Sequence, residues 1–193
     1  MGANTGQFAL KMRSIFPNAM IYSFEPIPTV FDLLLENFKG DKKFKGFNFG
    51  LGNKTEMMSF NLNEFSDSSS LLKMTDVHKT NFPHTNNESS ITISVEKLDV
   101  VFKDEIISPL LIKLDVQGFE DKVIFGGENI ISKADLIITE VSFYELYENQ
   151  TLFDKIYTDL RKLGFEYIGN YDQLRSPLNN KILQADAIFA KKQ

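Results

Sequence analysis

The chain has 193 residues, of which 42% are hydrophobic, and a formal net charge of −5 at pH 7. This length predicts a single domain over residues 1–193, and the acidic balance argues against a nucleic-acid-binding protein, which would need a basic face. The absence of cysteine excludes disulfides, thiolate metal sites and cysteine nucleophiles.

Helices and strands alternate along most of the chain. Pro17 and Gly40 end the first two helices, Thr151 is the predicted N-cap of the last one, and the nearly continuous apolar run at 110–116 is typical of a central parallel strand. In chain order, periodicity and turn residues predict helix 7–16, strand 19–26, helix 28–40, strands 45–53 and 56–62, a polar loop or flap over 63–90, strands 91–98 and 110–116, helix 120–127, strand 135–143, helix 152–163, and strands 165–171 and 184–192.

This order predicts an α/β fold with a mostly parallel sheet and helices on both faces. The two closing strands, which a polar segment connects, indicate an antiparallel edge. Both histidines, His78 and His84, fall in the polar 63–90 segment, where we expect solvated side chains. No third strong ligand stands beside them, so we expect no metal site.

Export and membrane signals are absent from the sequence. No apolar run reaches the roughly 18 residues of a membrane helix, and the first residues lack the basic and apolar segments of a signal peptide. We therefore expect a cytoplasmic protein that does not contact a membrane.

The chain opens with a glycine-containing loop, GANTG at residues 2–6, that runs into the first helix. Such a loop lets a ligand approach the backbone where no Cβ intervenes, and the helix start adds partial positive charge. The spacing is neither Gly-x-Gly-x-x-Gly nor that of a phosphate-binding loop. A plain strand-to-helix turn is the alternative.

Glu25 ends the next predicted strand, 19 residues after Gly6. An acid about 20 residues past a glycine loop can accept both hydroxyls of a ribose. The alternative is a surface glutamate before a proline turn. Loop and acid together favour a nucleoside ligand.

Six segments resemble, in order, the FkbM-type family of S-adenosylmethionine-dependent methyltransferases. They are GANTGQF, FEPIPTVFDLLLEN, LGN, SSSL, IKLDVQGFE with its continuation DKVIFGG, and TEVSFYELY. The resemblance implies a Rossmann-like class I methyltransferase sheet, S-adenosylmethionine as cofactor, and O-methylation of a hydroxyl on a sugar or other small metabolite.

The resemblance also implies which residues bind the cofactor. The loop would border its methionine end, Glu25 would hold the ribose, and the turn after the third strand would lie by the adenine. The implied residues are Gly2, Ala3, Asn4, Gly6, Glu25, Pro26, Asn48, Leu51 and Ser69. Family members have a strand before the loop, at the centre of the sheet, and Met1 stands where its last residue should be. We therefore expect an N-terminally truncated chain that lacks this first central strand.

Four charged residues are expected at one edge of the sheet. Lys113 and Asp115 lie two apart on a strand and so share a face near its carboxyl end. Glu120 follows at the next helix, and Glu140 ends the neighbouring strand. We expect Asp115 to position or deprotonate the acceptor hydroxyl, with Lys113 tuning it and with Glu120 and Glu140 supporting the site or binding a metal. The alternative for Glu120 is stabilisation of its helix start.

Two other functions remain open on sequence alone. A nicotinamide-dependent oxidoreductase is disfavoured by the glycine spacing. A truncated or decayed Rossmann-like domain without catalysis is supported by the missing strand. The acceptor, a small molecule or glycan, and the oligomeric state are not specified by any motif.

Overall fold

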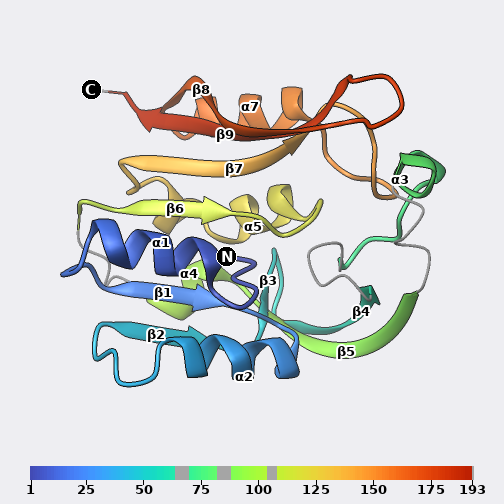
Figure 1. Cartoon of the computed structure of the whole chain (residues 1–193). Helices are drawn as coiled ribbons and strands as arrows, with labels where there is room; N and C mark the ends of the chain where they lie inside the picture. The colour runs from blue at the N-terminus through green and yellow to red at the C-terminus, as the bar shows by residue number, and fades with distance from the viewer. Residues whose placement is uncertain (64–69, 82–87, 104–107, 193) are drawn as a thin grey trace.

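The computed structural model describes residues 1–63, 70–81, 88–103 and 108–192 (Figure 1). The helices are α1 (Gln7–Ile15), α2 (Pro28–Asn37), α3 (Asp76–Asn81), α4 (Leu98–Phe102), α5 (Glu120–Gly126), α6 (Glu128–Ile131) and α7 (Phe153–Lys162). The strands are β1 (Ile21–Phe24), β2 (Phe44–Phe47), β3 (Gly50–Leu51), β4 (Glu56–Asn63), β5 (Glu88–Glu96), β6 (Leu111–Leu114), β7 (Leu136–Ser142), β8 (Phe165–Arg175) and β9 (Ile182–Lys191). The predicted α/β class is confirmed.

The described strands form three sheets rather than one. β1 and β2 pair in parallel, β3, β5 and β4 form a second sheet, and the third has the order β6-β7-β9-β8. β6 and β7 are parallel, whereas β9 runs antiparallel to both β7 and β8. The predicted antiparallel pairing of the closing strands is therefore present. In Figure 1, β1, β2, β6 and β7 all point toward the same edge.

The first residues link the ends of β1 and β6. The amino group of Met1 donates to the carbonyl of Lys113 (2.9 Å), and Asp115 donates its backbone N–H to Met1 (3.2 Å). Ala3 donates to the carbonyl of Phe24 at the end of β1 (2.9 Å). That the first central strand of the family's sheet is missing before this loop remains a prediction.

Apolar residues pack the helices in two groups. Ala9, Leu34 and Phe38 join α1 to α2, while a larger cluster joins α4, α5, α6 and α7 to β6, β7 and β9. Figure 1 shows the first pair on the near side of the strands, as expected for helices on both faces. Burying these apolar faces is the main favourable term in folding such layers.

Three local predictions were wrong. The strand predicted over 45–53 is split into β2 and β3, because β2 pairs with β1 whereas β3 pairs with β5. The polar 63–90 segment contains α3, which begins where the Thr75 hydroxyl accepts the N–H of His78 (3.4 Å). Leu152, not Thr151, is the N-cap of α7, and no side chain caps it.

Helices α4 and α6 were not predicted, since five and four residues are too few for a periodic pattern. No helix of the described residues is long and apolar enough to cross a bilayer.

Candidate active site

A cavity of about 340 Å³ opens at the carboxyl ends of β1 and β6. Its apolar lining residues include Ile27, Val30, Phe60, Leu71 and Ile93. Its lining also includes the polar side chains of Asn4, Glu25, Asp115 and Gln117 and the backbone of Gly2 and Ala3. A pocket of this size and character suits a small organic ligand that has an apolar part and several polar groups.

The glycine loop forms one wall because Gly2 brings it against β6. A Cβ on Gly2 would lie 1.6 Å from the carbonyl oxygen of Asp115, and the residue has a φ of +69°. No other residue fits there without moving the chain. Gly6 has a different role: a Cβ there would meet Leu34 at 2.8 Å, so Gly6 lets α1 approach α2 and does not line the cavity.

Glu25 is buried, with 5% of its surface exposed, and its carboxylate is anchored by backbone amides. Oε2 accepts the N–H of Asn4 (2.8 Å), and Oε1 accepts the N–H of Ile27 (2.9 Å). Burial raises the pKa of Glu25, although these two amide bonds oppose the shift. Because each carboxylate oxygen has two acceptor sites, Glu25 can accept two further hydroxyl donors.

Of the other residues expected at the cofactor, some line the cavity and others do not. Pro26 and Leu51 line the cavity. Asn48 does not, because its side-chain amide donates to the backbone carbonyls of Glu25 (2.9 Å) and Pro26 (3.3 Å) and so supports the turn after β1. Ser69 lies outside the described residues, as does His84.

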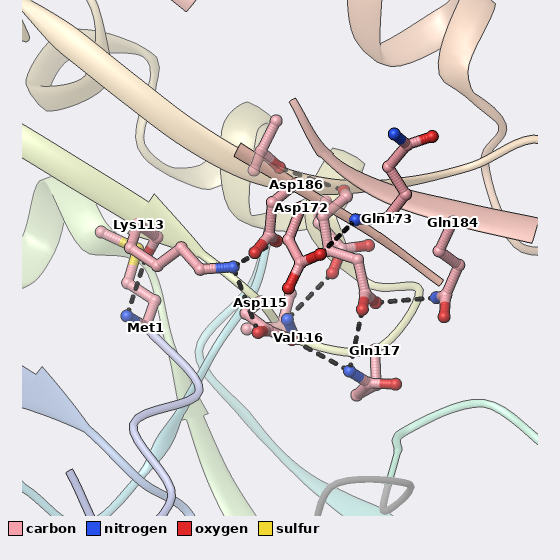
Figure 2. Close-up of polar contacts among 12 residues, drawn as sticks. Met1, Lys113, Asp115, Val116, Gln117, Asp172, Gln173, Gln184 and Asp186 are labelled. Atoms are coloured by element: carbon pink, nitrogen blue, oxygen red, sulfur yellow. Dashed lines mark hydrogen bonds and ion pairs between the residues drawn. The ribbon is translucent and has the colours of Figure 1, made fainter. Parts of the chain in front are cut away.

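Lys113 is bound by two carboxylates at the edge of the cavity (Figure 2). Its Nζ lies 2.6 Å from Oδ1 of Asp186 on β9 and 3.2 Å from Oδ2 of Asp115. Burial lowers the pKa of Lys113, but Asp115 and Asp186 outweigh this effect and raise it above its ordinary value. Lys113 therefore remains a cation, and only Asp115 of this trio lines the cavity.

Gln117 links Asp115 to β7. Its Nε2 donates to Oδ1 of Asp115 (2.9 Å) and lies 3.4 Å from Oε1 of Glu140, while its Oε1 accepts the hydroxyl of Tyr147 (2.8 Å). The residue has a φ of +52°, and its carbonyl accepts the Ser70 hydroxyl (2.6 Å). A non-glycine residue in this conformation requires support from its surroundings.

Glu120 and Glu140 lie behind Asp115 rather than at the cavity. Glu120 accepts the N–H groups of Val116 (2.9 Å) and Gly118 (3.0 Å), so its carboxylate holds the turn after β6. Burial raises the pKa of Glu120 to about 7. Burial, then Asp115 and Glu120, raise the pKa of Glu140 well above its usual range, and Gln184 donates to it (2.9 Å).

Sequence reasoning missed Asp186, Gln117, Gln184 and Tyr147. The available signal was the pair of polar residues at alternate positions in the apolar strand QADAIFA, which places Gln184 and Asp186 on one face. The expectation of a solvated His78 was wrong: it is buried on α3, with its ring 5.2 Å from that of Tyr147. Within the described ranges, no three His, Asp or Glu side chains form a group that could hold a metal.

Comparison with known proteins gives a consistent result. The family model described as "Methyltransferase FkbM domain" matches residues 1–167. The 2-O-methyltransferase NoeI of Sinorhizobium fredii is 26% identical over 157 residues, covering 78% of this chain and 65% of NoeI. The hexuronic acid methyltransferase AglP of Haloferax volcanii is 27% identical over 143 residues, covering 73% of this chain and 54% of AglP.

The fold has a counterpart among solved structures. The crystal structure of the methyltransferase FkbM from Methylobacillus flagellatus aligns with a TM-score of 0.56 at 14% identity, over 98% of this chain and 41% of that one. The chain thus spans from about two fifths to just under two thirds of the length of these three proteins.

Proposed function

The chain belongs to the FkbM methyltransferase family, and we propose that it transfers a methyl group from S-adenosylmethionine to a hydroxyl of a sugar or related small molecule. The observation that carries this proposal is that Glu25 and Asp115 line the same cavity. One is suited to a ribose, and the other is suited to an acceptor hydroxyl.

The residues of the cavity fit S-adenosylmethionine. Glu25 has acceptor capacity left for the two ribose hydroxyls. The backbone of Gly2, Ala3 and Asn4 passes beside it and would border the methionine part, while Leu51 and Ile27 offer apolar surface to the adenine. S-adenosylmethionine supplies the electrophilic methyl group, which its sulfonium activates.

The position of Asp115 at the cavity supports a role at the acceptor hydroxyl. A neutral hydroxyl attacks weakly, so a carboxylate that accepts its proton speeds the transfer. Asp115 is 34% exposed at its side chain and is the carboxylate next to Lys113 that reaches the cavity. Lys113 keeps a positive charge beside it and limits the repulsion from Asp186 and Glu140.

The similar proteins support the acceptor class. One is a 2-O-methyltransferase and the other a hexuronic acid methyltransferase. The first name states O-methylation and the second a sugar acid, and together with the carboxylate of Asp115 at the cavity they favour O-methylation of a sugar.

The test is transfer of label from methyl-tritiated S-adenosylmethionine to a panel of methyl glycosides that includes neutral hexoses, deoxyhexoses and hexuronic acids. Asp115→Asn should lower transfer at least about 100-fold, the typical contribution of a general base, and leave S-adenosylhomocysteine binding within about twofold. Asp121→Asn on α5 is the matched control, because Asp121 pairs only with its neighbour Lys122 among the described ion pairs. Near-normal transfer by Asp115→Asn would refute the assigned role.

A further inference from the structure

We propose that Asp186 and Tyr147, which do not line the cavity, are positioning residues that hold the two carboxylate oxygens of Asp115. The proposal rests on the function proposed above and extends it to a pair of side chains on β9 and on the segment after β7.

The first arm runs from Oδ2 of Asp115 through Lys113 to Asp186. Lys113 lies closer to Asp186 (2.6 Å) than to Asp115 (3.2 Å). Because the ammonium group of Lys113 is shared with Asp186, its contact with Asp115 stays long. Oδ2 of Asp115 therefore keeps acceptor capacity for a substrate hydroxyl. Without Asp186, Lys113 would be free to pair with Asp115 alone and to occupy the acceptor sites of Oδ2.

The second arm runs from Oδ1 of Asp115 through Gln117 to Tyr147. The Tyr147 hydroxyl donates to Oε1 of Gln117, which turns the amide nitrogen toward Asp115 (2.9 Å) and Glu140 (3.4 Å). The opposite orientation would set the amide oxygen against two carboxylates. Tyr147 is fully buried among Met74, Leu146 and Leu183, so its hydroxyl is fixed in place.

The two arms end at different oxygens of the Asp115 carboxylate, Oδ2 and Oδ1, so together they fix the orientation of the whole group. Asp115 comes directly after β6, in a turn that contains the left-handed Gln117 and Gly118. A carboxylate on such a turn would otherwise sample several rotamers, and a small displacement of a reacting group costs a large part of the rate.

The first arm is tested by the pKa of Lys113, measured by carbon-13 NMR of its Cε in the whole chain. The charged groups that face Lys113 are Asp115, Asp186, Glu140 and the amino group of Met1. Asp186→Asn should lower this pKa, because one of the carboxylates that raise it is lost, and Asp186→Glu should restore it. The control is Asp121→Asn on α5, because the Asp121 carboxylate pairs with Lys122 and no contact described for it reaches Lys113.

The second arm is tested by the solvent exchange of the Gln117 side-chain amide. Tyr147→Phe keeps the buried ring and removes the hydroxyl, so exchange should accelerate about fivefold, the value expected from losing one hydrogen bond. Tyr157→Phe on α7 is the control, with no expected change. If Asp186→Asn does not fold, Asp186→Ser is measured in its place.

Two results would overturn the proposal: an unchanged Lys113 pKa in Asp186→Asn, or unchanged Gln117 exchange in Tyr147→Phe. Both readouts are independent of turnover. S-adenosylhomocysteine titrations of the same variants should give dissociation constants within about twofold of the parent, as expected for residues remote from the cofactor. If the parent itself fails to bind this nucleoside, the proposed function fails, while the NMR results still decide whether the two arms exist.

Discussion

The backbone N–H of Asn4 donates a 2.8 Å hydrogen bond to Oε2 of Glu25. This bond ties the glycine loop to the end of β1 and orients the buried carboxylate toward the cavity. Loop and acid therefore form one unit, although Asn4 and Glu25 are 21 positions apart in the chain. Their joint position is the basis of the cofactor assignment.

Replacing Glu25 with Gln should weaken S-adenosylhomocysteine binding at least about tenfold, because hydrogen bonds to a charged acceptor are each worth roughly 1.5–3 kcal/mol. Isothermal titration calorimetry measures the change. Glu36→Gln on α2 is the control, since Glu36 is exposed and pairs with Lys39. Equal affinity of the Glu25 variant and the parent would contradict ribose binding by this residue.

Replacing Gly2 with Ala should displace the loop, because the new Cβ would fall 1.6 Å from the Asp115 carbonyl. We expect weaker S-adenosylhomocysteine binding and a loss of roughly 2 kcal/mol in the free energy of unfolding. Gly40→Ala separates the two causes of this loss: its φ is +83°, but nothing lies within 4 Å of the added Cβ. If both variants bind the nucleoside like the parent, the close approach at Gly2 has no part in binding.

The free energy of unfolding should fall as the pH rises through the titration of Glu120. Its pKa is about 7 in the folded state and 4.5 ordinarily, so between these values the folded state binds more protons than the unfolded state. Stability then decreases with rising pH. Glu25 and Glu140, whose pKa values are also raised, act in the same direction, whereas the Met1 amino group, whose pKa burial lowers to about 6, opposes them above about pH 6.

Urea unfolding of Glu120→Gln at pH 5, 6 and 7 should show a shallower decrease than the parent. The variant should also be less stable at pH 5, since Gln cannot accept both the Val116 and Gly118 amides. Glu128→Gln on α6 provides a control at an exposed glutamate. An equal pH dependence of the parent and Glu120→Gln from pH 5 to 7 would show that Glu120 is not buried as described.

Neutral sugars should be methylated faster than hexuronic acids. Asp115 and Asp186 share a single lysine next to the cavity, so two carboxylates face one cation, and like charges repel an anionic acceptor. Initial rates with methyl glucoside and methyl glucuronide, at equal concentration and at low and high salt, measure the preference. A faster reaction with the glucuronide would show that a cation outside this cluster binds the acceptor.

The α/β class and most element positions follow from the sequence because apolar periodicity records which face each element buries. The break between β2 and β3 could not be predicted, since aromatic residues recur on both sides of Asn48 and only strand pairing decides where the segment divides. His78 was misjudged for a similar reason. The segment around it is mostly polar in sequence, but the ring of Tyr147, 69 residues further on, packs against it.

The positions of two site residues could be predicted from the sequence segments in which they lie. Glu25 and Asp115 each end a buried strand, and parallel strands bring such ends to one edge. Asp186 could not be assigned, because its partner Lys113 lies 73 residues away and on another strand. Gly6 and Asn48 were placed at the cofactor by resemblance, yet helix packing and the turn after β1 account for their contacts.

The most direct test of the account is a crystal structure of the protein with S-adenosylhomocysteine. We expect the nucleoside in the cavity at the ends of β1 and β6. Both ribose hydroxyls should donate to the Glu25 carboxylate, and the sulfur should lie on the side of Asp115. A nucleoside bound elsewhere, or one whose ribose makes no contact with Glu25, would contradict it.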